Sequence, residues 1–218
     1  MAGFDPKITD FTNPVAPNLP LAPIQYDRQF QDQFENILRL YFNQLDNSFG
    51  SLLGPSGGKY LKFPYGAFSS SDSQSTTANT ATLMTLNTTD FSNEVSISSS
   101  KITVVNSGIY NLQFSAQVQS TDVAPQDVFI WLKQNGTDIT GSTGKVGMPA
   151  RKNPSDPFHS IIGWNYFVSM AANDYIEIYW STTSANVSIQ YYAASGTPTK
   201  PSTQSVVATM TFVSRLPS

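Results

Sequence analysis

Two different spacings of apolar side chains divide the chain. Between Tyr26 and about Phe49, apolar residues recur at every third or fourth position, which predicts one amphipathic helix. From about Tyr60 to Ser218, apolar and polar residues alternate instead, which is the spacing of β-strands. The sequence therefore predicts a mainly β protein preceded by one helix. The residues of the helical stripe are Phe30, Phe34, Ile37, Tyr41, Leu45, Phe49 and Leu52.

The helical stripe needs a partner. Burying each such side chain contributes roughly 1.5–3 kcal/mol, so a stripe left in water forgoes on the order of 10–20 kcal/mol, comparable to the whole stability of a protein. The stripe can pack on the chain's own β-region or on copies of itself. Phe30, Tyr41 and Leu52 are eleven residues apart, as are Phe34 and Leu45. That repeat favours a nearly straight bundle of identical helices.

Residues 1–25 are expected to be extended. Five prolines in this segment disfavour a helix, yet apolar side chains are spread through it, unlike a flexible Gly/Ser linker. We interpret the segment as a docking arm that becomes ordered on another protein; a disordered tail is the alternative. The apolar anchors of this arm are Phe4, Ile8, Phe11, Val15, Leu19, Leu21 and Ile24.

The β-region is predicted to hold about eight to ten strands, a number typical of a sandwich or jelly roll. Its clearest strand is Gly108–Val118, and Asn135-Gly136 predicts a tight hairpin after Val128, Ile130 and Leu132. A second turn is expected at 172–174. Further alternating segments include Trp164–Met170, Ile176–Trp180, Val187–Tyr191 and Val206–Phe212, with shorter candidates near Lys62–Phe68, Thr80–Leu86 and Ile102–Val105.

Composition narrows the classes of function. Charged residues make up 12% of the chain, about half the usual share, and the formal net charge is −3. No cluster of lysine or arginine supplies a nucleic-acid footprint. No apolar run approaches the ~20 residues that span a bilayer. The chain has no cysteine and its first residues lack the pattern of a signal peptide, so we expect assembly in a reducing cytoplasm.

Several β segments carry a resemblance to C1q/TNF-like domains. Residues 101–116 resemble the central signature of that family, and 128–136 resemble its next strand and Asn-Gly turn. Residues 166–178 are similar to its hairpin and 205–212 to its last strand, although Asn173-Asp174 replaces the usual Gly-Asp and no collagen-like stalk precedes the domain. The resemblance covers about Phe63–Val213. It implies a compact ten-stranded jelly roll that assembles as a homotrimer.

The front of the chain carries a second resemblance. Residues 21–30, followed by 40–47, look similar to the N-terminal region of short tailed-phage virion proteins, in which an arm and a short helix precede a β-rich head. Together the two resemblances imply a virion protein of fibre, appendage or decoration type. The organisation expected is an arm at 1–25, a helical stalk at 26–53, a Gly-rich joint at 54–62 and a C1q-like head at 63–218.

The sequence offers little catalytic chemistry. A Ser-His-Asp triad would have to use His159, the single histidine, with Ser155 and Asp156 nearby in a proline-flanked loop that is more typical of a turn. The segment 141–145 lacks the spacing of a phosphate-binding loop. We therefore predict no catalytic residues, no cofactor and no enzyme activity.

No metal site is predicted either. The sequence has too few Cys and His residues for a zinc centre. Asp122, Asp127 and Asp138 are near enough in sequence to suggest a calcium loop, but solvated loops are the favoured interpretation.

Three aromatic residues near Ser- and Thr-rich loops can stack on sugar rings, or else fill the core or an interface: Trp180, Tyr191 and Tyr192. The favoured function is a non-enzymatic homotrimeric virion protein, anchored by its arm to a capsid, collar or tail, with an exposed head that meets a host-surface glycan. The alternative is a stand-alone C1q-like module that binds carbohydrate or protein, and a depolymerase is disfavoured because carboxylates are sparse. Membrane insertion and nucleic acid are not expected.

Overall fold

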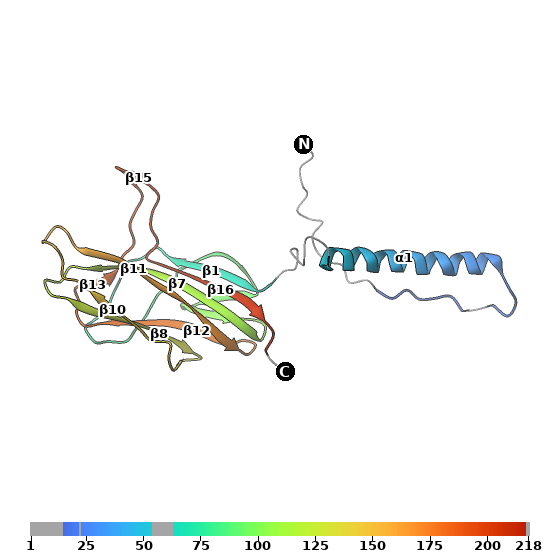
Figure 1. Cartoon of the computed structure of the whole chain (residues 1–218), viewed down its shortest axis with the longest axis horizontal. Helices are drawn as coiled ribbons and strands as arrows, with labels where there is room; N and C mark the ends of the chain where they lie inside the picture. Colours follow the sequence, from blue (N-terminus) through green and yellow to red (C-terminus); the bar gives the residue numbers. More distant parts are fainter. Residues whose placement is uncertain (1–14, 22, 54–62, 217–218) are drawn as a thin grey trace. The chain divides into compact units, whose positions relative to one another are not determined.

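A computed structural model describes residues 15–21, 23–53 and 63–216, and for 51–53 the backbone only. The chain divides into two compact units, residues 1–62 and residues 63–218. The first unit contains helix α1 and the second contains the β-strands (Figure 1). Each unit is described separately below.

Helix α1 spans Arg28–Leu53. Asp27 caps its first turn, because its Oδ1 atom accepts a hydrogen bond from the Gln29 backbone N–H at 2.8 Å. The helix begins slightly later than the spacing predicts and continues through Gly50. The joint predicted at 54–62 lies outside the described residues. Among the described residues, no helix combines the length and the apolar character needed to cross a membrane.

The first sheet, named here the β7 sheet, is built around the long strand β7. Strand β11 lies along one edge of β7, while β16 and β13 share the other edge. Beyond β16 follow β1 and then β4, and β2 pairs with β13. The strands of this sheet are β1 (Tyr65–Ser70), β2 (Gln74–Ser75), β4 (Thr88–Asn93), β7 (Gly108–Ser120), β11 (Phe158–Met170), β13 (Val187–Ile189) and β16 (Val206–Ser214).

The second sheet, the β8 sheet, has the order β10-β8-β12-β6-β5. In addition, β3 pairs with β12 and β9 pairs with β8. Every strand pair in both sheets is antiparallel. The strands are β3 (Thr82–Leu83), β5 (Val95–Ser98), β6 (Lys101–Val104), β8 (Gln126–Gln134), β9 (Thr137–Asp138), β10 (Gly144–Met148) and β12 (Tyr175–Thr182).

The two sheets pack face to face as a jelly-roll sandwich, which confirms the predicted fold class. The chain passes from β7 to β8 and from β11 to β12, so consecutive long strands alternate between the sheets. In β7, Tyr110, Leu112, Phe114, Ala116 and Val118 all face the core, as the alternation predicts. Each of them is buried, and the core continues into Ile130, Leu132 and Ile176 of the opposite sheet.

Two turns occur where the sequence predicts them, and they are joined to each other. Asn135 and Gly136 have φ values of 51° and 80°, so they form the two-residue turn between β8 and β9. Asp174, in the turn between β11 and β12, accepts hydrogen bonds from Nδ2 of Asn135 at 2.7 Å and Nε2 of Gln134 at 2.9 Å. These bonds lower the pKa of the Asp174 carboxyl. The Asn-Gly turn is therefore pinned to its neighbour.

Three strands of four or more residues were not predicted. Strand β4 is exposed and mostly polar, and β10 contains two glycines, so neither shows a clear alternation. Strand β5 is short and follows directly after β4. By contrast, the strand predicted at Thr80–Leu86 is reduced to Thr82–Leu83.

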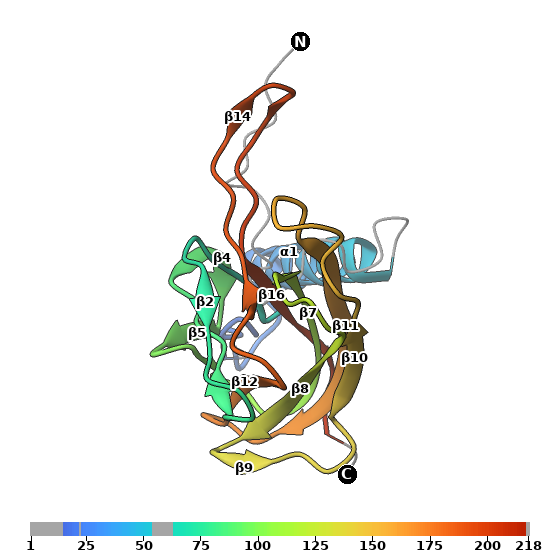
Figure 2. The same cartoon turned by 90° about the vertical axis from the view of Figure 1, so that its left-hand side faces the viewer.

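A two-stranded ribbon extends away from the sandwich between β13 and β16. It consists of β14 (Ser195–Gly196) and β15 (Thr199–Lys200), and both views show it projecting beyond the sheets (Figures 1 and 2). A single bridge between Tyr192 and Thr203 closes its base. Residues 196–202 are all exposed. The ribbon is therefore held mainly by its own backbone.

Candidate interaction surfaces and binding pocket

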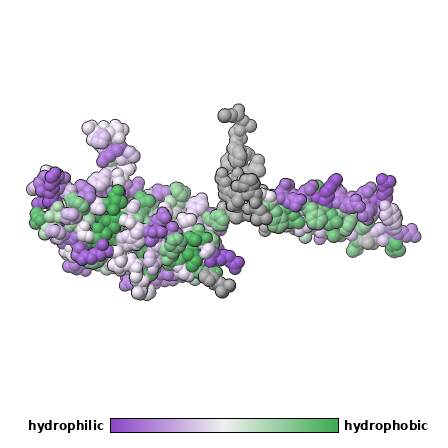
Figure 3. Space-filling model, in the orientation of Figure 1, coloured by the Kyte–Doolittle hydropathy of each residue, from purple (hydrophilic) through white to green (hydrophobic). Residues whose placement is uncertain are grey.

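Within its own unit, the apolar stripe of α1 is not buried. No side chain described between Arg28 and Gly50 is buried, and Phe49 is 54% exposed. Figure 3 shows apolar residues following the length of α1, with polar residues along its other edge. The side chain of Leu52 is not described. The half-buried members of the stripe are Phe30, Phe34, Ile37, Tyr41 and Leu45.

The stripe is wider than the sequence analysis recognised. Leu38 and Phe42 continue from Phe34 at steps of four, and Phe42 is 56% exposed. The rings of Phe30 and Phe34 stack at 6.2 Å, and those of Tyr41 and Phe42 lie 6.0 Å apart. A broad stripe of this kind is typical of a helix with more than one helical neighbour, whereas a two-stranded coiled coil uses a narrower seam.

The described part of the predicted arm is exposed. Val15, Leu19 and Leu21 are all exposed, and Leu21 is 95% exposed. The anchors Phe4, Ile8 and Phe11 lie outside the described residues. The docking function of these side chains therefore stays a prediction.

The outer face of β11, β7 and β16, named here the uncharged face, carries no charged residue. None of the residues in these three strands is Asp, Glu, Lys or Arg. Alternation places Ile161 and Phe167 of β11 outward, where they are 67% and 56% exposed. Val207 and Val213 are exposed on β16, on the other side of β7. The outward side chains of β7 itself are mostly Gln, Asn and Ser. Charge depletion with exposed apolar groups is typical of the centre of a protein–protein interface.

The opposite outer face, on the β8 sheet, is different in chemistry. Lysines lie over aromatic rings: Lys101 over Tyr175 at 4.3 Å and Lys133 over Tyr179 at 4.5 Å. Lys145 lies over Phe129 and forms an ion pair with Asp127 at 2.8 Å. We call this the lysine–aromatic face. Each of its three lysines lies over an aromatic ring, and two of them also pair with a carboxylate.

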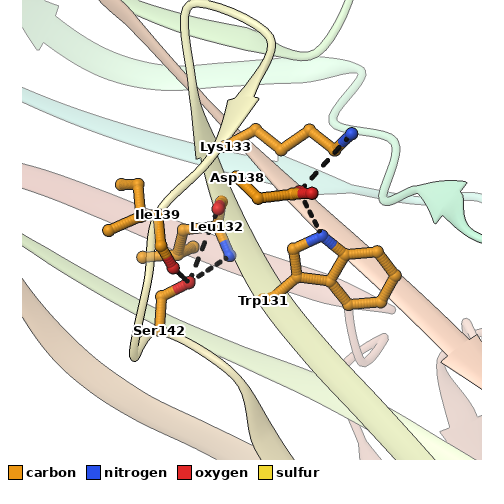
Figure 4. A network of polar contacts seen from close by, with 6 residues as sticks. All are labelled: Trp131, Leu132, Lys133, Asp138, Ile139 and Ser142. Carbon is orange, nitrogen blue, oxygen red and sulfur yellow. Dashed lines mark hydrogen bonds and ion pairs between the residues drawn. The ribbon is translucent and has the colours of Figure 1, made fainter.

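Figure 4 shows how one part of the lysine–aromatic face is held. Asp138 Oδ1 accepts a hydrogen bond from the Trp131 indole at 2.8 Å and lies 3.5 Å from Lys133 Nζ. On the adjacent turn, Ser142 Oγ accepts from the Leu132 backbone N–H at 3.0 Å and donates to the Ile139 carbonyl at 2.7 Å. These bonds fix the segment 139–142. Gly141 in this segment has a φ of 81°, which is typical of a turn and not of a phosphate-binding loop.

Of the three aromatics predicted to stack on a ligand, Trp180 is excluded. The ring of Trp180 is fully buried, because it faces the core with Ile176 and Ile178 by the period of β12. Burial of the ring therefore excludes stacking on a ligand and supports the core position that the sequence also allows for Trp180. Tyr191 is half-buried, and its backbone N–H donates to Ser73 Oγ at 3.0 Å. Tyr192 is also half-buried and lines a pocket.

This pocket has a volume of about 270 Å³ and lies where β7 ends and β11 begins. Three strands and the loop residue Tyr192 contribute to it. Its lining residues are Gln117, Val118, His159, Tyr192 and Lys200. Gln117 and Val118 come from β7, His159 from β11, and Lys200 from β15 of the ribbon. The sequence singled out Tyr192 for stacking and His159 only for a possible triad. It gave no sign of Gln117, Val118 or Lys200, because these residues are far apart in the chain.

A hydrogen-bonded chain orders the side chains at this pocket. Tyr192 Oη donates to Gln119 Oε1 at 3.3 Å and lies 3.0 Å from His159 Nδ1. Because the phenol has one hydrogen, donation to Gln119 leaves its oxygen to accept a hydrogen bond from Nδ1 of His159 in the tautomer that is protonated there. Burial raises the pKa of the Tyr192 phenol.

A larger pocket, of about 640 Å³, lies at the loops that follow β7, β10 and β12. Asp127 in its lining is already paired with Lys145, and Thr183 Oγ1 donates to Gln126 Oε1 at 2.6 Å. Its polar groups are thus engaged with each other. Its lining residues are Pro125, Gln126, Asp127, Gly147, Met148, Pro149 and Thr183.

The three carboxylates considered for calcium have separate partners. Asp122 accepts hydrogen bonds from Ser184 Oγ at 2.5 Å, the Ala124 N–H at 3.0 Å and Asn186 Nδ2 at 3.2 Å. These bonds, the one from Ser184 first, lower the pKa of Asp122 to about 2. Asp127 and Asp138 pair with Lys145 and Lys133. In the part of the chain that the structure describes, no group of three His, Cys, Asp or Glu residues is placed to hold a metal ion.

The side chains considered for a triad are engaged separately. His159 is hydrogen-bonded to Tyr192, and Ser155 Oγ donates to Asn153 Oδ1 at 2.9 Å. Asp156 lies 3.8 Å from Lys152 Nζ. The described contacts thus place these three residues in different interactions.

Comparison with known proteins gives a likeness among solved structures. No family model matches the chain, and no curated protein matches it. Among solved structures, the chain is similar to the globular domain of zebrafish complement 1qA protein, with a TM-score of 0.41 and 10% sequence identity. The match covers 71% of this chain and 99% of that chain.

Proposed function

We propose that this protein is a non-enzymatic, homotrimeric structural component of a tailed-phage virion. In this proposal the α1 helices form a three-helix stalk, the arm docks on the particle, and the β-sandwich is the exposed head. The observation that carries the proposal is the broad apolar stripe of α1, none of whose described side chains is buried by the rest of its own unit.

Two further observations support self-association. The eleven-residue repeat of the stripe allows identical helices to cover one another along a nearly straight axis. The uncharged face supplies a second surface, because Ile161, Phe167 and Val207 are exposed without any charge on the three strands that carry them. The resemblance to C1q/TNF-like domains implies the same trimeric state.

The arm supports attachment to a particle. Val15, Leu19 and Leu21 are exposed apolar side chains within a proline-rich segment, which suits an extended peptide that orders on a partner. The resemblance of residues 21–30 and 40–47 to phage virion proteins makes that partner a capsid, collar or tail protein. The protein would be made in the host cytoplasm and act in the virion.

Deletion of residues 1–25 tests the docking arm. We expect the truncated protein to trimerise but not to join particles assembled in its presence, as measured by its amount in purified virions. A matched control replaces the arm by a Gly/Ser segment of equal length, which should fail in the same way. Retained incorporation of either variant would exclude arm docking and favour the stand-alone binding module.

Ile37→Asp tests the stalk. A charge in the stripe of a three-helix bundle is buried without a partner, so we expect it to cost several kcal/mol and to abolish the stalk. Asn43→Asp, on the polar side of the same helix, is the control. Circular dichroism should show loss of helix only for Ile37→Asp, while the unfolding transition of the β-unit stays in place. Loss of the β-unit transition would contradict the proposal.

A further inference from the structure

The pocket beside the ribbon lies at one end of the uncharged face, where Gln117 and His159 point outward, and it gathers groups that can carry positive charge. Phe167, where we expect copies to meet, lies at the other end of β11. His159 is the only histidine of the chain and lies on β11, a strand without charged residues. Lys200 reaches the same pocket from β15. No carboxylate is among the five lining residues, so nothing in the lining competes for an anion. The electrostatics of the pocket therefore favour a negatively charged group.

The uncharged groups of the pocket call for a ligand that also has hydrogen-bonding groups besides its negative charge. Gln117 offers both a carbonyl oxygen and amide hydrogens, and the phenol oxygen of Tyr192 has a further lone pair. Several ligand hydroxyls satisfy these acceptors, whereas an inorganic phosphate dianion has only one. The half-buried ring of Tyr192 adds an apolar surface of the kind on which a sugar ring packs. A ligand with hydroxyls, an apolar face and one negative charge matches this set.

The size of the pocket limits the ligand to one unit. Its volume of about 270 Å³ is below the roughly 300–1,000 Å³ that is typical of sites for drug-sized molecules. The chain His159–Tyr192–Gln119 holds the side chains in place before a ligand arrives, which lowers the entropic cost of binding. A single monosaccharide within a longer glycan fits these limits.

We propose that this pocket binds one acidic sugar unit of a glycan. The sugar carboxylate pairs with Lys200, its hydroxyls bond to Gln117 and His159, and its ring packs against Tyr192. This inference rests on the proposed function, in which the β-sandwich is an exposed head. It adds the binding site and the class of ligand.

Binding of methyl glucuronide to the full-length protein tests the site, measured by ligand-observed NMR titration. We expect a dissociation constant in the millimolar range, as befits one small sugar. Methyl glucoside, which lacks the carboxylate, should bind at least tenfold more weakly, and inorganic phosphate should not displace the glucuronide. Equal binding of the glucoside, or displacement by phosphate at the same concentration, would overturn the acidic-sugar assignment.

Variants locate the site. Lys200→Gln and His159→Gln should each weaken glucuronide binding about tenfold or more, while Lys152→Gln, another exposed lysine outside the pocket, should leave it unchanged. Unchanged binding by both pocket variants would refute the site. Light scattering on the same samples separates the two proposals: glucuronide binding by a monomer contradicts the trimer alone, and a trimer that binds no glucuronide contradicts this inference alone.

Discussion

The two outer faces of the sandwich differ in the charge and apolar character of their outward side chains. On the β8 sheet, outward side chains include Lys133, Lys145 and Asp127, and each of them is paired with an opposite charge or an aromatic ring. On the β7 sheet, β11, β7 and β16 carry no charge at all, yet Ile161 and Phe167 are exposed. A face whose charges are paired within itself is suited to water. A face with no charge and exposed apolar groups is suited to a protein partner.

The two sheets differ in their outward side chains and not in their contribution to the core. Both sheets bury their inner sides in one core, so the core does not distinguish them. Only the outward positions differ. Changes at those positions should therefore affect assembly on one face and, to a smaller extent, stability on the other.

The largest effect is expected from a charge on the uncharged face. Phe167→Asp places a carboxylate where we propose that copies meet, and burying it without a partner is costly. We expect the dissociation constant of the trimer to rise about 100-fold or more, as measured by sedimentation at several concentrations. Val105→Asp, at another exposed apolar residue outside that face, is the control and should not change assembly. Equal behaviour of the two variants would remove the face from the interface.

A smaller effect is expected from one methyl group on β11. A Cβ at Gly163 would overlap the Phe114 carbonyl oxygen of β7, and backbone cannot yield cheaply. Gly163→Ala should lower the unfolding free energy by about 1–3 kcal/mol in urea denaturation. Gly147→Ala on β10 meets nothing within 4 Å, so it should be close to neutral. A neutral Gly163→Ala would show that the β7–β11 pairing is looser than described.

Acid should lower the unfolding free energy through a hydrogen-bonded carboxylate, Asp122, and not through the uncharged face. The folded pKa of Asp122 is about 2, below its ordinary 3.8, so the stability that its ionised form contributes is complete above pH 5. It is lost as the pH falls through 3.8 towards 2. Urea midpoints at pH 6 and pH 2.5 should therefore differ less in Asp122→Asn than in the unmodified protein. An undiminished difference would assign the acid sensitivity to other groups.

The smallest effect is expected from the lysine–aromatic face. Lys133→Met removes the contact with the Tyr179 ring and the pairing with Asp138 but keeps an apolar stem. The unfolding free energy should fall by about 1 kcal/mol or less, with no change in oligomeric mass. A change in mass would mean that this face, too, takes part in assembly.

Much of the fold could be predicted from local patterns. The alternation of Tyr110, Leu112 and Phe114 identifies β7 and its inner face, and Asn135-Gly136 identifies a hairpin because both residues tolerate positive φ. Strand β4 could not be predicted in this way, because its position depends on pairing with β1 and not on a hydrophobic pattern.

The candidate sites were less accessible to sequence reasoning. The stripe of α1 follows from its spacing, but the uncharged face is visible only once β11 and β16 are known to flank β7. The same holds for the pocket, since Gln117, His159 and Lys200 converge only through the tertiary fold. For Trp180 the sequence left two roles open, and the period of β12, which turns its ring inward, decides for the core.

The central claim is that this chain assembles as a homotrimer. The most direct test is the mass of the full-length protein in solution at micromolar concentration, by size-exclusion chromatography with light scattering. We predict three times the 23.8 kDa of one chain. A mass of 23.8 kDa at that concentration would contradict both the three-helix stalk and the role of the uncharged face.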